Sequence, residues 1–265
     1  MTWIDALILG IIQGLTEFLP ISSSGHLEIG AVLLGINSTN HLLFALAVHF
    51  ATCLSTMFVF HKEIFVLVEG LLKFKWNDST QFILKIIISM IPLGVIGLLF
   101  ESEIEALFKG NLFLVGGMLI LTSILLFVTR HIKQASGEVT FGKSLVIGLA
   151  QSIAILPGIS RSGSTIVIAL ILGVSRERAA KFSFLMVLLP IIGASLLKIK
   201  EHIEFANSEY QVNTLDLFLG FIAAFISGYL SCRWMVKIVK KGRLIYFSLY
   251  CLFLGLTAIF FSYFL

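Results

Sequence analysis

Two stretches of this chain share a pattern that an uninterrupted membrane helix cannot contain. Residues 13–26 and 151–165 each run from an apolar segment through a proline into a serine-rich loop that is closed by glycine. Ser22 in the first stretch and Ser160 in the second are offset by 138 residues. Proline and a run of small polar residues interrupt a helix. We therefore predict that each stretch folds as a half-helix, a loop and a second half-helix.

The composition places the chain in a membrane. Hydrophobic residues make up 58% of the sequence, charged residues make up 13%, and the mean hydropathy is +1.01. No soluble domain of 265 residues needs so much apolar surface, so we predict a polytopic membrane protein. The isoelectric point near 9.0 does not indicate nucleic acid as a partner, because the basic residues lie in short connectors where topology and anionic lipid account for them. Three cysteines lie in apolar runs and are expected to be free: Cys53, Cys232 and Cys251.

Six apolar runs each approach the roughly 20 residues that a membrane-spanning helix needs. Two further regions, 3–36 and 143–174, contain the interrupted stretches. Non-helical backbone at membrane depth is tolerated only where it is buried in protein or lines a cavity. We therefore predict an all-α integral membrane fold with six transmembrane helices and two re-entrant helical hairpins. The predicted spans are 42–60, 82–100, 111–129, 183–199, 214–233 and 244–264.

The order of these elements indicates an internal duplication, because a hairpin and three spans are followed by another hairpin and three spans. Three spans is an odd number, so the second copy must enter the membrane upside down, as in transporters built from inverted repeats. We predict a single membrane domain over 1–265, with a first repeat over 1–130 and a second over 141–265.

The distribution of lysine and arginine predicts the orientation. Fifteen of the 19 lie in or beside four alternate connectors, and three lie in the others. Cytoplasmic loops carry the excess of positive charge. The first hairpin then enters from outside and the second from inside, so their tips meet near the middle of the membrane and the C-terminus lies outside. The basic connectors are 61–81, 130–143, 174–182 and 233–243.

Three ionisable residues, Glu17, His26 and Arg161, fall at predicted membrane depth, where such groups are costly and usually functional. Gln13 lies four residues before Glu17 and therefore on the same helical face. Backbone N–H groups of a Gly/Ser loop at a helix start form an anion site, and Arg161 adds a planar fork suited to phosphate oxygens. Serine, His26 and Glu17 beside such a receptor are the parts of a nucleophile–base–orienter unit. For the serines and glycines taken singly, close helix packing is the competing interpretation.

At these residues the chain resembles the undecaprenyl-diphosphate phosphatase family of the bacitracin-resistance type. The resemblance covers the full length and rests on two signature stretches, QGLTEFLPISSSGH at 13–26 and PGISRSGST at 157–165. It implies hydrolysis of undecaprenyl (polyprenyl) diphosphate to the monophosphate and phosphate, which recycles the lipid carrier for cell-wall synthesis and confers bacitracin resistance. It also implies a homodimer in the bacterial plasma membrane, with an active site that faces the outer side.

Matched by position, the resemblance implies catalytic roles for Glu17, Ser23, His26 and Arg161. Ser23 is the predicted nucleophile, His26 the base or acid, and Glu17 the group that orients His26 or a bound cation. Attack by His26 itself or by an activated water remains an alternative. Substrate-binding positions are expected at Gln13, Ser22, Ser24, Gly25, Ser160, Ser162, Gly163, Ser164 and Thr165.

The resemblance also implies support of the activity by a divalent cation, Mg²⁺ or Ca²⁺. Many family members carry glutamate where this chain has Gln13, so the sequence shows no self-sufficient metal cage and no residue is assigned as a metal ligand. Any ion is expected to be bound together with the diphosphate. The rival interpretation is a polyprenyl-phosphate flippase or transporter, which needs the anion pocket but no nucleophile. His49 lies in the first predicted span and can line the site, although packing is its favoured role.

Overall fold

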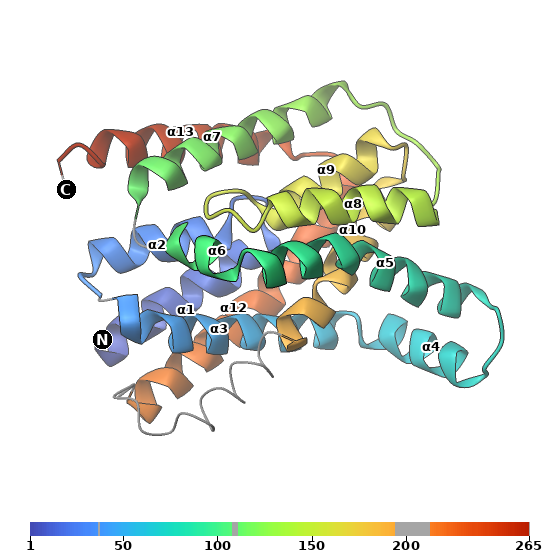
Figure 1. Ribbon diagram of the computed structural model, residues 1–265, viewed down its shortest axis with the longest axis horizontal. Coiled ribbons are helices and arrows are strands. Elements are labelled where there is room, and N and C mark those ends of the chain that lie inside the picture. Colours follow the sequence, from blue (N-terminus) through green and yellow to red (C-terminus); the bar gives the residue numbers. More distant parts are fainter. Residues whose placement is uncertain (37, 108–110, 194–212, 265) are drawn as a thin grey trace.

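The computed structural model describes residues 1–36, 38–107, 111–193 and 213–264, and this part of the chain is helical (Figure 1). Within these ranges, extended pairing is limited to one isolated bridge between Gly137 and Val174. The helices are α1 (Trp3–Phe18), α2 (Ser23–Leu33), α3 (Ser38–Val59), α4 (His61–Leu72), α5 (Asp78–Leu99), α6 (Glu101–Leu107), α7 (Leu112–Val128), the 3-10 turn η1 (Thr129–His131), α8 (Phe141–Ile153), α9 (Arg161–Ile171), α10 (Arg176–Met186), α12 (Thr214–Lys241) and α13 (Ile245–Phe261).

Both interrupted stretches contain the predicted break. A short loop separates α1 from α2, and a second loop separates α8 from α9. The second loop turns at Gly158, whose φ of +98° lies in the region that glycine adopts without strain. The chain therefore presents two helix–loop–helix units, and each is followed by longer helices.

Small residues allow the helix before each loop to pack closely on a long apolar helix. Gly10 of α1 faces the backbone of α12 at Gly220, and Gly148 of α8 faces the backbone of α5 at Ser89. A Cβ atom at either glycine would overlap the neighbouring carbonyl group. Gly10 and Gly148 are again offset by 138 residues, so the two units are anchored in the same way.

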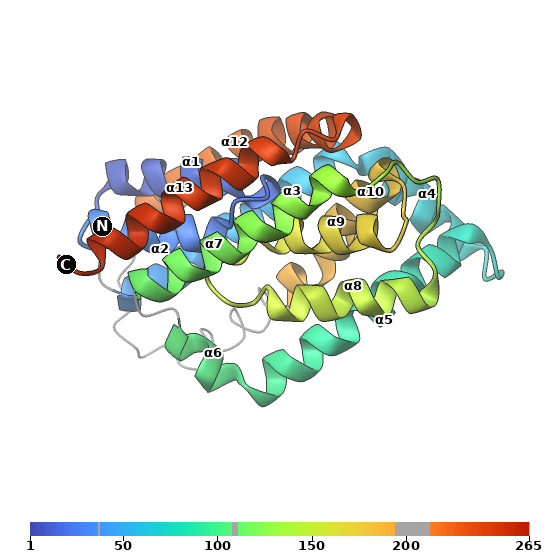
Figure 2. The same cartoon turned by 90° about the horizontal axis from the view of Figure 1, so that it is seen from above.

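A third close pair joins the two halves of the chain. The carbonyl of Gly116 on α7 lies against Gly255 on α13, and the carbonyl of Gly255 lies against Gly116. Both views show α7 and α13 side by side along one edge of the molecule (Figure 1, Figure 2). Close approach through small residues is the usual way that helices associate in lipid, where the hydrophobic effect does not drive them together.

Several helices have the length and composition of membrane helices. Among the described residues, three helices are long and apolar enough to cross a bilayer, and α3 from Phe44 would make a fourth together with α4, to which it is bent by 79°, if the bent pair is one span. Large apolar side chains stay exposed along these helices, including Leu98 of α5 at 78% and Phe218 of α12 at 60%, as expected for contact with lipid. The three helices that are long and apolar enough by themselves are Asp78–Leu99, Leu112–His131 and Thr214–Lys241.

The prediction of a loop over 61–81 is wrong for its first part. His61–Leu72 form α4, because their apolar residues continue the hydrophobic run of α3 past the bend. The residues after Leu72 form the turn into α5. The turn is closed by Asn77, whose side-chain amide donates to the carbonyl of Gly70 at 2.7 Å. Predicted span 183–199 begins inside α10, and its end falls within 194–212, outside the described residues.

Candidate active site

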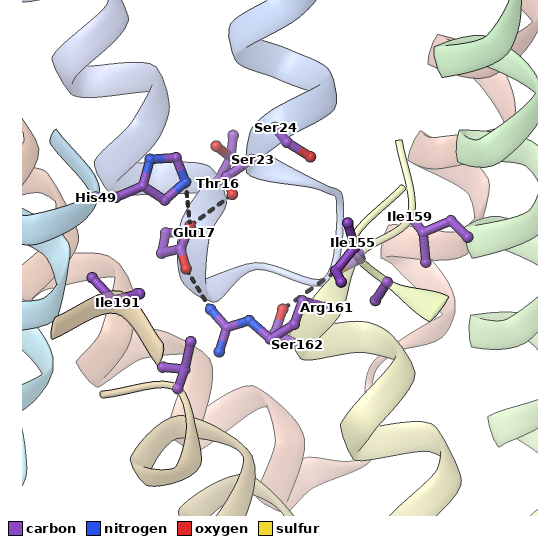
Figure 3. A pocket seen from close by; sticks show the side chains of 13 residues that line it. Thr16, Glu17, Ser23, Ser24, His49, Ile155, Ile159, Arg161, Ser162 and Ile191 are labelled. Atoms are coloured by element: carbon purple, nitrogen blue, oxygen red, sulfur yellow. Dashed lines mark hydrogen bonds and ion pairs between the residues drawn. The ribbon is translucent and has the colours of Figure 1, made fainter. Parts of the chain in front are cut away.

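The two loops meet at a pocket of about 180 Å³ (Figure 3). Its polar side comes from α1, α2, α3 and the start of α9. Its apolar side comes from the second loop and from the chain that follows α10. The lining residues are Thr16, Glu17, Ser23, Ser24, His49, Ala154, Ile155, Ile159, Ser160, Arg161, Ser162, Val187 and Ile191.

The helices after the two loops begin with the same cap. The Ser22 hydroxyl accepts a hydrogen bond from the Gly25 N–H at 3.2 Å, and the Ser160 hydroxyl accepts one from the Gly163 N–H at 3.0 Å. A serine in this position satisfies one of the N–H groups that lack a partner inside the helix. The repeated sequence pattern thus produces a repeated local structure.

The residue after each cap differs between the two units. It is Ser23 at the start of α2 and Arg161 at the start of α9, and both side chains line the pocket. The starts of both helices border the same pocket, and helix N-termini carry partial positive charge and free N–H groups that favour an anion. A hydroxyl and a guanidinium are therefore brought together at a site suited to phosphate.

Glu17 connects these two side chains. Arg161 Nη2 donates to Glu17 Oε1, and the Ser23 hydroxyl donates to Glu17 Oε2 at 2.7 Å. The Gln13 amide nitrogen also donates to Oε2, at 3.0 Å. Only 7% of Glu17 is exposed, so this carboxylate depends on its partners. The arrangement fixes the Ser23 hydroxyl against a potential proton acceptor.

Two buried polar atoms beside Glu17 lack a hydrogen-bond partner among the described residues. They are Nη1 of Arg161 and the amide oxygen of Gln13. A buried polar atom without a partner is unfavourable, and at a functional site it indicates a missing ligand or water. The free nitrogen of Arg161 can donate to an oxyanion in the pocket while the other nitrogen stays paired with Glu17.

His26 does not approach Ser23 in the way that the sequence predicted. Its Nδ1 lies 2.7 Å from the carbonyl oxygen of Ser22, and its Nε2 lies 2.8 Å from the hydroxyl of Tyr250. The two rings stack with centroids 5.6 Å apart. Ser22 has a φ of +68°, which is strained for a residue other than glycine. His26 thus braces the backbone next to Ser23, and it is not among the residues that line the pocket.

The histidine that the structure brings to Glu17 is His49 of α3. Its Nε2 lies 3.8 Å from Glu17 Oε2, and it lines the pocket. We expected packing to be the main role of His49, whereas the structure places its side chain at the pocket. A sequence signal for the position of His49 was present, because Thr52 follows it about one turn later in the same apolar helix. In the structure the Thr52 hydroxyl lies 3.5 Å from the Gln13 amide nitrogen. A stripe of polar residues on an apolar helix marks a face directed at a polar site.

The remaining predicted substrate-binding residues divide into two groups. Ser24, Ser160 and Ser162 line the pocket. Thr165 instead makes a hydrogen bond of 2.6 Å with Ser183 on α10. The other four residues, Ser22, Gly25, Gly163 and Ser164, are buried and are not among the lining residues.

Sequence reasoning missed the residue that anchors the second loop. The hydroxyl of Thr122 on α7 donates to the Gly158 carbonyl and accepts from the Ser160 N–H, both at 3.0 Å. The first turn of α2 lies against the second loop, because a Cβ atom at Gly25 would lie 3.1 Å from the Cα of Gly158. Contacts between residues so distant in sequence leave no local pattern by which to predict them.

The donor set does not form a metal centre by itself. Within the described residues no group of three or more histidine, cysteine or acidic side chains could hold an ion. Glu17 is the one carboxylate among the residues that line this pocket. Its oxygen atoms and the unpaired oxygen of Gln13 could serve as ligands only together with oxygens from a bound molecule.

Fold and site together define a membrane protein, helical throughout its described part, with a pocket at which a serine hydroxyl, a buried carboxylate and a guanidinium meet. The model of the bacitracin resistance protein BacA family matches residues 6–257, and the chain belongs to this family. It is 50% identical over 264 residues to a protein of Christiangramia forsetii named undecaprenyl-diphosphatase, with 98% of each chain covered. A protein of the same name from Bacteroides fragilis is 49% identical over 260 residues, again with 98% of each covered. Undecaprenyl-diphosphatase 1 of Bacillus licheniformis is 36% identical over 267 residues, with 98% of each chain covered.

Proposed function

We propose that this protein is a membrane phosphatase that hydrolyses undecaprenyl (polyprenyl) diphosphate to the monophosphate and phosphate. The reaction returns the lipid carrier to cell-wall synthesis and supports resistance to bacitracin. The observation that carries the proposal is the bridge at Glu17, which holds the Ser23 hydroxyl and the Arg161 guanidinium at one pocket. Relatives that cover nearly the whole chain are named for this activity.

Ser23 is the nucleophile in this proposal. Its oxygen forms a bond to the terminal phosphorus, the bond from phosphorus to the lipid monophosphate breaks, and the hydroxyl proton passes to Glu17 Oε2, which already accepts it at 2.7 Å. The free Nη1 of Arg161 and the N–H groups of the two helix starts neutralise the charge on the transferring group. His26 acts through Ser22 as a positioning residue.

The apolar side of the pocket suits the lipid. Ile155, Ile159, Val187 and Ile191 line the pocket beside its polar residues. Apolar side chains beside an oxyanion site favour a substrate whose phosphate is attached to hydrocarbon, because the first isoprene unit is removed from water as the diphosphate binds. Soluble diphosphates lack this contribution to binding.

A divalent cation, Mg²⁺ or Ca²⁺, is proposed as a component bound with the substrate. Glu17 and Gln13 offer oxygens beside the pocket, and the diphosphate supplies the remaining ligands. When bound, the ion reduces the negative charge of the diphosphate. The oxygen of Gln13 is neutral, so the protein alone holds a cation weakly.

We further propose six spans, two re-entrant hairpins and an inverted repeat, with the halves at 1–130 and 141–265. Equivalent caps at Ser22 and Ser160 support the repeat, as do the equivalent packing contacts at Gly10 and Gly148. The loop charges support an active site that opens to the outer side of a bacterial plasma membrane. A homodimer remains a prediction from the family resemblance.

Phosphate release by the purified protein tests the function. Undecaprenyl diphosphate in detergent, with Mg²⁺ or Ca²⁺ supplied, should release phosphate with the wild type. Ser23→Ala should lose nearly all release, whereas Ser24→Ala, at the next pocket-lining serine, should keep appreciable activity. A wild type that releases no phosphate but moves labelled polyprenyl phosphate between leaflets would establish the flippase instead.

Single cysteines in a cysteine-free background test the topology. An impermeant thiol reagent on intact cells should label position 103, in α6, and should not label position 77, in the turn between α4 and α5. Labelling in the reverse pattern contradicts the orientation and the outward-facing site.

A further inference from the structure

A second proton acceptor is needed if Ser23 is the nucleophile, because each turnover contains two attacks on phosphorus. The first attack transfers the phosphoryl group to Ser23, and its proton passes to Glu17. The second attack, by water, releases phosphate and requires an acceptor for the proton of the water. General bases of this kind must present a free lone pair toward the reacting group.

Most of the lone-pair positions of Glu17 already accept hydrogen bonds from other groups. Its Oε1 accepts from Arg161, and its Oε2 accepts from both Ser23 and Gln13. The proton received from Ser23 must also stay there until it returns to the serine oxygen. Glu17 is therefore poorly placed to accept the proton of an attacking water.

Neither ring nitrogen of His26 is available for this step. A carbonyl oxygen can only accept, so Nδ1 of His26 donates to Ser22, and the neutral ring then accepts at Nε2 from the Tyr250 hydroxyl. His26 thus contributes a brace and no free lone pair.

His49 has the required geometry. Its Nδ1 lies 2.7 Å from the carbonyl oxygen of Ala45, which can only accept, so the hydrogen of the neutral ring is on Nδ1 and the lone pair is on Nε2. That Nε2 makes no hydrogen bond to the described residues and lies 3.8 Å from Glu17 Oε2. The His49 side chain is 29% exposed and is directed at the pocket beside Ser23 (Figure 3).

The surroundings of His49 contain few other charged groups. Glu17 faces it from α1, and Arg161 of α9 lies on the far side of Glu17. Cys53, one turn further along α3, is buried. From α2 the pocket receives the hydroxyls of Ser23 and Ser24, and the helix α12, which packs on α3, contributes none of the residues that line it.

We propose that His49 is a further catalytic residue, whose Nε2 accepts the proton of the water that hydrolyses phosphorylated Ser23; this inference rests on the proposed function. The water oxygen forms a bond to phosphorus, and the bond from phosphorus to the Ser23 oxygen breaks. One water proton passes to His49, the other stays on the phosphate, and Ser23 recovers its proton from Glu17. His49 then releases its proton to the solvent.

His49→Gln tests this role, because glutamine retains size and polarity but does not titrate. With undecaprenyl diphosphate radiolabelled in the terminal phosphate, the variant should release phosphate about 10²–10⁴-fold more slowly. Acid-quenched protein should carry label on Ser23, because the first attack remains while the second is slow.

Two histidine variants serve as controls. His61→Gln removes an exposed histidine of α4 whose Nδ1 also contacts a backbone carbonyl, and it should behave as wild type. His26→Gln should lower the rate without leaving label on Ser23, because His26 positions the backbone beside Ser23 and has no part in the second attack. The proposal is overturned if His49→Gln keeps a rate within threefold of wild type, or if its loss of activity comes without labelled Ser23. A wild type without phosphate release would instead contradict the proposed function itself.

Discussion

The two helix–loop–helix units have the same framework and carry different chemistry. Each has a serine cap bonded to a glycine three residues later, and in each the cap serine lies 3.3 Å from the hydroxyl two residues on. At the equivalent positions between them, however, one unit has Ser23 and the other has Arg161. The two units therefore share a framework while their pocket-facing residues differ.

A second pair of equivalent positions shows the same division. Glu17 precedes the first loop, and Ile155 occupies the place 138 residues later. Both line the pocket, from opposite sides. The first unit therefore supplies the nucleophile and its acceptor, and the second supplies the cation and an apolar surface. The two loops have similar frameworks but supply different residues, so the site that they form is asymmetric and suits a molecule with one charged end and one apolar end.

Among the tests of this comparison between the two units, the largest expected effect comes from removing the cation of the second unit. Arg161→Ala should lower phosphate release by about 10²–10³-fold, since a lost charge contact in a transition state costs roughly 2.7–4 kcal/mol. Arg161→Lys should rescue poorly, because a lysine lacks the fork that serves Glu17 and an oxyanion together. Arg178→Ala, at an exposed ion pair with Glu138, should keep normal activity. Normal turnover by folded Arg161→Ala would remove this residue from the site.

The prediction of intermediate size compares Gln13 with Gln151, the glutamine at the equivalent position of the second unit, and concerns their effects on phosphate release. Gln13 donates to the charged Glu17, a contact worth about 1.5–3 kcal/mol, so Gln13→Ala should lower phosphate release about 10–100-fold. Gln151 is buried, and neither polar atom of its side chain has a partner among the described residues. Gln151→Leu should therefore keep the activity and raise the melting temperature in detergent. Equal losses of activity in both variants would show that the two units are not specialised.

The smallest expected effect concerns the shared framework. Ser22→Ala and Ser160→Ala each remove an N-cap, which should lower the free energy of unfolding by about 0.5–2 kcal/mol. Because the caps are equivalent, the two variants should lose similar amounts, measured as melting temperatures in the same detergent. A loss confined to one of the two would mean that only one loop depends on its cap.

The sequence by itself determined the features that local physics controls. Its composition placed the chain in a membrane, and Pro157-Gly158 and the serine runs predicted both helix breaks. The spacing of Gln13 and Glu17 put both on one face, where their side chains meet at 3.0 Å. These predictions succeeded because helix breaking, capping and helical periodicity act between residues a few positions apart.

The tertiary structure alone decided which distant groups meet. It assigned His26 to Tyr250, 224 residues away, and brought His49 to Glu17. It joined Arg161 to Glu17 across 144 residues. Two histidines in apolar surroundings have the same local signature, and only the packing of α3 and α13 around the loops distinguishes the histidine that braces the backbone from the one that faces the pocket.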